Sequence, residues 1–123
     1  MTTPVDSAFV IQPQDSTAFA RLSGDFNPLH LDSVAARRLQ FGDTVCHGVH
    51  LVLLALEGLA RSGALRSRSL LAVSAVFLQP VRTGVAVQCV ATPDASGGRI
   101  KVSGMVAARA QFTVQLTVGP ETP

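Results

Sequence analysis

Tryptophan and tyrosine are absent from the sequence, and its six aromatic residues are all phenylalanine. Lysine is nearly absent too, since Lys101 is the only one, and the arginines are scattered without a dense run. Proteins that bind nucleic acids usually carry a basic patch, often with aromatic rings on which bases stack. The net charge is only +2, so we expect no nucleic-acid partner.

Cysteines and long apolar runs are also few. Cys46 and Cys89 are not enough for a disulfide framework, and no secretory signal is visible. The longest apolar run, residues 51–56, is far shorter than the roughly 20 residues that span a membrane. We therefore expect a cytoplasmic protein without a membrane segment. Cys46 directly precedes His47, but neighbouring helix residues point about 100° apart, which disfavours a nucleophile–base pair.

Charged side chains make up 15% of the 123 residues, against about 25% in an average domain. The mean hydropathy of +0.36 is correspondingly high. The length predicts one domain over residues 1–123, and so few polar side chains would leave a monomer with an unusually apolar surface. This composition favours a homodimer whose interface hides part of that surface.

The first third of the chain is expected to form one strand and two short helices. Residues 7–12 alternate as in a strand, after a frayed tail over residues 1–6. A helix capped by Asp15 or Ser16 should run to Ser23, and a second, capped by Asp32, should end at Gly42. The side chains expected to be buried by these two helices are Ala18, Phe19, Leu22, Ala35, Ala36 and Leu39.

A longer helix is expected next, capped by Asp43 or Thr44 and ending near Gly63. Residues 49–56 are apolar nearly all round, which is typical of a helix enclosed by other structure. Four polar residues fall in one sector of this helix, which predicts either a solvent- or interface-facing stripe or, in part, the lining of a substrate tunnel. The stripe consists of His47, which we interpret as structural, Arg61, and the two candidate tunnel residues His50 and Glu57.

The rest of the chain predicts a sheet. Residues 69–79 are almost continuously apolar, which favours a central strand buried on both faces. Strands over 85–92 and 99–107 are joined by a hairpin loop, and residues 109–118 alternate strictly. Gly104 marks a bulge or a close approach. The periodicity therefore gives an α+β fold, an antiparallel sheet curled round a helix.

The stretch with the clearest chemical content is Asp25–Asp32, with the sequence DFNPLHLD. Pro28 fixes its own φ and moves Asn27 out of the helical region, so the chain must bend between Asp25 and His30. Such a bend can bring a carboxylate and an imidazole to one water, as general acid–base chemistry requires. The plainer interpretation is a helix end, an Asx turn and a surface histidine.

Together with Phe41 and with His47-Gly48 before an apolar helix, this motif resembles the MaoC-like (R)-specific enoyl-CoA hydratases. The resemblance implies a hotdog fold, a homodimer and reversible syn hydration of trans-2-enoyl thioesters of CoA or of an acyl carrier protein. It implies that Asp25 and His30 activate the water and that the Gly48 amide stabilises the thioester oxyanion. Asn27 shapes the bend beside them.

The resemblance implies no cofactor, and the sequence has neither a glycine-rich phosphate loop nor a closed metal site, since His47 and His50 lack a third ligand nearby. Candidate contacts for the pantetheine arm or phosphates are Arg66, Arg68 and Arg82. The chain departs from the family at residues 53–56, where a small hydroxyl residue often lies and this sequence has none. The length of the acyl group is therefore open.

Three other functions fit the sequence. A dehydratase acting on acyl carrier protein would use Asp25 and His30 in the reverse direction. A hotdog thioesterase would use an acid on the central helix, and Glu57 is the candidate. A non-catalytic acyl-binding module would need no Asp–His pair.

Overall fold

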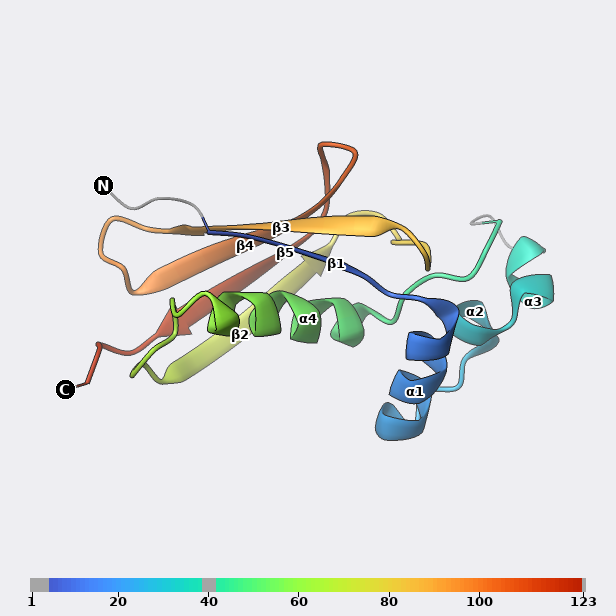
Figure 1. Cartoon of the computed structure of the whole chain (residues 1–123), viewed down its shortest axis with the longest axis horizontal. Helices are drawn as coiled ribbons and strands as arrows, with labels where there is room; N and C mark the ends of the chain where they lie inside the picture. The colour runs from blue at the N-terminus through green and yellow to red at the C-terminus, as the bar shows by residue number, and fades with distance from the viewer. Residues whose placement is uncertain (1–4, 39–41, 123) are drawn as a thin grey trace.

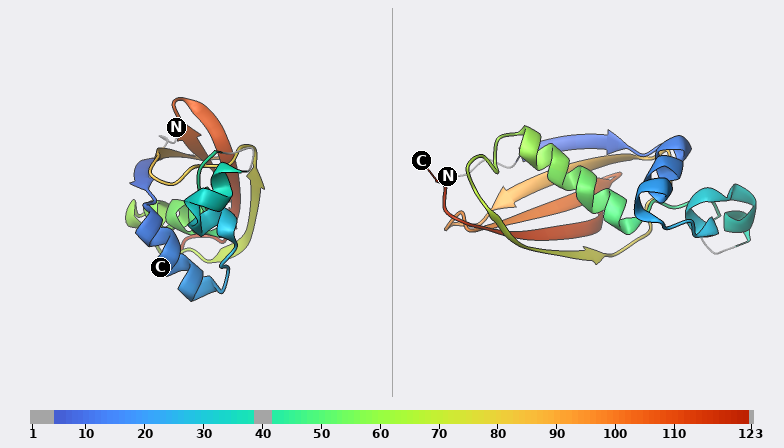
Figure 2. Two further views of the ribbon diagram at one scale, coloured as in Figure 1. Left: turned by 90° about the vertical axis from the view of Figure 1, so that its right-hand side faces the viewer. Right: turned by 90° about the horizontal axis from the view of Figure 1, so that it is seen from below.

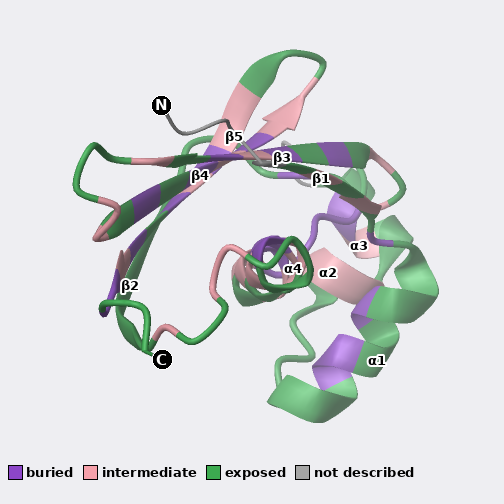
Figure 3. Ribbon diagram, turned by 60° about the vertical axis from the view of Figure 1, so that its left-hand side comes forward, coloured by how far each residue is buried: buried purple, intermediate pink, exposed green. Residues whose placement is uncertain are grey.

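The computed structural model describes residues 5–38 and 42–122. A five-stranded antiparallel sheet in the order β1-β3-β4-β5-β2 curves round one long helix, α4 (Figures 1 and 3). Three short helices form a lobe at the end of the sheet where α4 begins (Figure 2). The elements are β1 (Val5–Val10), α1 (Pro13–Ser23), α2 (Pro28–Leu31), α3 (Ser33–Arg37), α4 (Gly48–Arg61), β2 (Leu70–Phe77), β3 (Ala86–Pro93), β4 (Arg99–Val106) and β5 (Arg109–Val118).

The core lies between α4 and the concave face of the sheet. Strands β3, β4 and β5 bury alternate residues, as their period-two pattern predicts. α4 contributes Leu51, Ala55 and Leu59, which are spaced four residues apart and share one face. The opposite face is open, with Val49 63% and Leu53 46% exposed. The expected enclosure of this helix is therefore wrong within a single chain.

β2 differs most from expectation. Its apolar run predicts a central strand buried on both faces, but β2 lies at the edge of the sheet, is paired with β5, and all eight of its residues are exposed. An apolar run shows only that a surface must leave water. It does not say whether the same chain or another molecule covers that surface.

The first strand and the first helix both begin earlier than expected. β1 begins at Val5, inside the expected tail. α1 begins at Pro13, because Asp15 sits in the first turn and accepts a hydrogen bond from Gln12 N at 2.8 Å, which completes a capping box. α1 buries Ser16, Phe19 and Ala20, whereas Ala18 and Leu22 are exposed.

Asp32 caps α3 as expected, with its carboxylate accepting from Val34 N and Ala35 N. α3 buries Ala36. Two residues of the sequence argument, Leu39 and Phe41, lie outside the described residues.

The start of α4 is later than expected. Asp43 and Thr44 do not cap it, because the chain remains extended there and Val45 forms a bridge with Arg82. Thr44 instead bonds through Oγ1 to Thr83 Oγ1 at 2.7 Å. α4 therefore begins only at Gly48.

Gly104 confirms the expected bulge and close approach. The β4–β5 register shifts at this residue, and a Cβ there would overlap the fully buried ring of Phe112. Both cysteines are buried and free. Within the described ranges, no helix is long and apolar enough to cross a membrane.

Candidate active site

Asp25 and His30 face each other across the turn that joins α1 to α2. Asp25 Oδ2 lies 3.8 Å from His30 Nε2. Gly24 ends α1 at φ 80°, a conformation that favours glycine. Asn27 then caps α2 by accepting a hydrogen bond from Leu29 N at 3.0 Å. The structure therefore contains the convergence that the five-residue spacing predicts.

The ring of His30 is oriented by its second nitrogen. His30 Nδ1 lies 2.8 Å from the carbonyl oxygen of Val45. A carbonyl oxygen can only accept, so Nδ1 carries the proton, and in the neutral ring Nε2 presents its lone pair toward Asp25. The side chain of His30 is 14% exposed and that of Asp25 is 51% exposed. Solvent therefore reaches the pair from the Asp25 side.

His47 lies beside the pair, where sequence reasoning did not place it. Its ring is buried and stacks on His30 with centroids 4.0 Å apart. His47 Nε2 donates to the backbone oxygen of Asp25 at 3.0 Å, which fixes the loop that carries the carboxylate. His47 precedes α4 and therefore does not belong to the polar stripe of that helix. The sequence contains one indication of this position. Side chains at the start of a helix tilt toward its N-terminal end, so a histidine directly before α4 faces the loops that precede the helix.

His50 lies one turn into α4 and stacks on Phe19 with centroids 4.5 Å apart. Burial, and then the neighbouring His47, lower the pKa of His50. His50 and Phe19 line a cavity of about 420 Å³ between α1, α4 and β1. Glu57 is bound to Arg61, one turn further on, at 2.5 Å, and both side chains are largely exposed. Two helical turns, roughly 10 Å, separate it from His50.

Gly48 is the first residue of α4, where N–H groups have no intrahelical acceptor and the helix dipole is positive. A Cβ at this position would lie 2.8 Å from Phe77 Cζ. The space in front of its α-carbon is therefore filled by an aromatic ring of β2. The close packing of Phe77 is therefore a structural reason for glycine at position 48.

The three candidate arginines lie in different places. Arg66 and Arg68 follow the C-terminal end of α4, and the Arg68 guanidinium donates to the backbone oxygens of Gly97 and Gly119. Arg82 is exposed and pairs with the segment that carries Val45, at the same end of α4 as the Asp–His pair. The structure therefore brings Arg82 near the site and leaves Arg66 and Arg68 at the far end.

Cys46, directly before His47, is buried, and burial raises the pKa of its thiol to about 11. A thiol that stays protonated at neutral pH is a poor nucleophile. Among the described residues, the group able to hold a metal ion is Asp25, His30 and His47, each of which places one ligand atom within 4.8 Å of the others.

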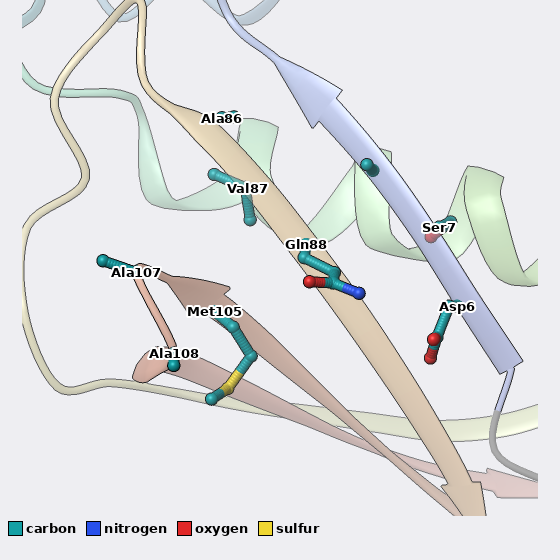
Figure 4. A pocket seen from close by; sticks show the side chains of 9 residues that line it. Asp6, Ser7, Ala86, Val87, Gln88, Met105, Ala107 and Ala108 are labelled. Atoms are coloured by element: carbon teal, nitrogen blue, oxygen red, sulfur yellow. The ribbon is translucent and has the colours of Figure 1, made fainter.

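A cavity of about 610 Å³ lies away from this site, beside β1, β3 and the β4–β5 turn. Figure 4 shows Gln88 and Met105 on this side of the sheet, with α4 behind it. Its one ionisable lining residue is Asp6. A lone carboxylate has no partner to share a proton with, so acid–base chemistry is better supported at the Asp–His pair.

Comparison with known proteins gives similarities in both sequence and fold. A 36-residue segment is 47% identical to the peroxisomal hydratase-dehydrogenase-epimerase of Saccharomyces cerevisiae, covering 29% of this chain and 4% of the yeast protein. The (R)-hydratase from A. caviae involved in PHA biosynthesis superposes with a TM-score of 0.79 and 24% identity, over 95% of this chain and 93% of its own.

The MaoC-like dehydratase from Rhodospirillum rubrum superposes with a TM-score of 0.75 and 20% identity, over 100% of this chain and 95% of its own. These likenesses establish the hotdog fold that the resemblance implies. The model of the MaoC like domain matches residues 2–118. The chain therefore belongs to the MaoC-like domain family.

Proposed function

We propose that this chain is a hydro-lyase that adds water to trans-2-enoyl thioesters and, in reverse, dehydrates (R)-3-hydroxyacyl thioesters. The observation that carries the proposal is the approach of Asp25 Oδ2 to His30 Nε2, at 3.8 Å, beside the N-terminus of α4. This distance is too long for a direct hydrogen bond and suits two groups that share one water. Membership of the MaoC-like family supports the same chemistry.

The two groups divide the work on that water. The Asp25 carboxylate accepts one O–H, and the lone pair of His30 Nε2 accepts the other. As the water oxygen bonds to C3 of the enoyl group, Asp25 takes the proton and returns it to C2. The hydroxyl and the proton then arrive on the same face, so addition is syn. Acid–base assistance of this kind contributes about 10²–10⁴ in rate.

The thioester oxygen gains negative charge during the attack and requires a donor. The Gly48 N–H is our candidate, since it lies in the first turn of α4 and directly follows His47, whose ring stacks on His30. A single backbone donor of this kind is worth about 10²–10³ in rate. Arg82 is the arginine best located to meet the phosphates or pantetheine of a CoA or carrier-protein substrate.

The alternatives have less support. A thioesterase using Glu57 would need that carboxylate free, whereas it is paired with Arg61 and about two turns beyond His50. A non-catalytic acyl-binding module would give no reason for orienting His30 Nε2 toward Asp25 through the bond to Val45.

We also propose that the active form is a homodimer joined through β2 and the open face of α4. A single chain exposes 7484 Å², whereas a 12.8 kDa monomer is expected to expose about 6,300 Å². The excess of about 1,200 Å² exceeds the roughly 800 Å² that each partner buries in a standard interface. The large apolar side chains exposed on α4, on β2 and directly after β2 are Val49, Leu53, Leu70, Leu71, Val73, Val76, Phe77 and Leu78.

The direct test is incubation of the purified protein with short and medium trans-2-enoyl-CoAs, followed by chiral analysis of the 3-hydroxyacyl product. We expect the (R)-product, with no release of free CoA. Release of CoA without hydration would support the thioesterase instead. Binding of the thioester without turnover would support the acyl-binding module.

A further inference from the structure

The Asp–His pair belongs to a larger group of ligand atoms. Asp25, His30 and His47 each place one oxygen or nitrogen within 4.8 Å of the other two. The three residues come from the loop after α1, from α2 and from the residue before α4. They are separated by five and seventeen positions in the sequence, so no short motif announces the group.

Both imidazoles are held as metal-binding histidines are usually held. His30 Nδ1 donates to the backbone oxygen of Val45, and His47 Nε2 donates to the backbone oxygen of Asp25. Each bond leaves the other ring nitrogen with a lone pair. A second nitrogen anchored to a carbonyl fixes both the tautomer and the ring orientation of a histidine ligand.

Neither of these lone pairs accepts a hydrogen bond from the described residues, and the one on His47 is also buried. Within the described part of the chain, His47 Nδ1 is buried and makes no hydrogen bond, in a residue that is 2% exposed. A buried polar atom left unsatisfied is costly and rare in native structures. A bound cation would satisfy it.

We propose that Asp25, His30 and His47 bind a divalent transition-metal ion, with zinc as the best match. Two imidazoles and one carboxylate are a ligand set suited to zinc, whereas magnesium and calcium prefer oxygen ligands. Three protein ligands leave one position for water. The side chain of Asp25 is half exposed, so it gives the ion an entry path from solvent.

Binding would stop the proposed reaction. The ion would occupy the carboxylate of Asp25 and the Nε2 lone pair of His30, the two groups that hold the reacting water. Zinc would therefore act as a reversible inhibitor. This consequence rests on the proposed function, but the binding itself does not.

Calorimetric titration of the full chain with zinc chloride tests the site independently of activity. We expect one zinc ion per chain, no comparable binding of magnesium, and a Kd at least about tenfold higher in Asp25→Asn and His47→Gln. His50→Gln is the matched control, since His50 is the third histidine of the chain and stands outside the group. It should bind zinc as the wild type does.

Because His47 is buried, circular dichroism must show that His47→Gln is folded, and otherwise His30→Gln takes its place beside Asp25→Asn. No zinc binding by the wild type, or equal loss in His50→Gln, would overturn the proposal. In the hydration assay, zinc should abolish turnover and a chelator should restore it. Full turnover by the zinc-loaded enzyme would show that zinc does not bind at Asp25, His30 and His47. A metal-free enzyme without hydratase activity would contradict the proposed function alone, since the titration would still report on the metal site.

Discussion

At the scale of single residues, the site depends on hydrogen bonds that do not involve the reacting atoms. Val45 orients His30, and His47 anchors the backbone of Asp25. The carboxylate itself accepts from Asn27 N at 3.1 Å. The two groups proposed to hold water are therefore fixed by bonds to backbone atoms, which cost little side-chain entropy.

Replacing either member of the pair should abolish most hydration. We expect Asp25→Asn and His30→Ala to lower kcat/KM by at least about a hundredfold, because each removes one acceptor for the water. The measurement is steady-state hydration of a trans-2-enoyl-CoA by folded variants. Asp6→Asn, an exposed carboxylate on β1, is the control and should retain activity. Near-normal turnover in either folded variant would exclude the pair as the catalytic group.

Gly48 and Phe77 should be energetically coupled. Gly48→Ala places a methyl group 2.8 Å from Phe77 Cζ, so the half-exposed ring must shift, at a cost of about 1 kcal/mol, the low end for overpacking. Phe77→Leu removes the obstructing ring, so it should recover a large part of that loss in the double variant. Urea unfolding of the two single variants and the double variant gives the coupling energy. Strict additivity would show that Phe77 does not restrict Gly48.

At the scale of elements, the β4–β5 hairpin carries visible strain. Its two-residue turn consists of Ala107 and Ala108, at φ 49° and 63°. Both values lie in the left-handed region, as a type I′ turn requires, and asparagine followed by glycine is the preferred pair there. Alanine at such positions costs of order 1–3 kcal/mol each.

The double substitution Ala107→Asn and Ala108→Gly should therefore stabilise the protein by about 1 kcal/mol or more, measured by denaturant unfolding. Ala110→Gly is the matched control, because Ala110 lies two residues further on in β5, outside the positive-φ set. That change should instead destabilise by about 0.5–1 kcal/mol. Loss of stability in the turn variant would show that the turn is not strained.

At the scale of the whole molecule, the edge strand β2 is an apolar surface that no other part of the described chain covers. A long, flat, apolar edge is a liability in a soluble protein unless it is covered. Two copies pairing through β2 would cover both edges at once, and a two-fold axis allows the same surface to serve both partners.

A charge in this edge should separate the copies. Val76 is 56% exposed on β2, and Val76→Asp would leave a carboxylate desolvated in the interface, which costs several kcal/mol. Light scattering at micromolar concentration should give twice 12.8 kDa for the wild type and 12.8 kDa for the variant. Val10→Asp, at the opposite edge of the sheet and 41% exposed, should remain dimeric. A monomeric wild type would refute the proposal.

The sequence by itself determined the features that depend on near neighbours. Gly24, Pro28 and the five-residue spacing predict the turn that brings Asp25 to His30, because those preferences act within a few residues. The alternation in β5 follows from local periodicity in the same way, and the bulge at Gly104 follows from a glycine inside a strand.

Only the tertiary structure decided what depends on distant partners. The position of β2 at an edge, the packing of Phe77 on Gly48, and the arrival of His47 beside His30 all join segments far apart in the chain. An apolar strand has the same sequence pattern whether it is buried by its own chain or by a second chain. A histidine next to a helix start is likewise the same residue whether it points to solvent or to a carboxylate loop 22 positions away. The tertiary fold decides whether β2 is covered and where His47 points, because it determines which surfaces come into contact.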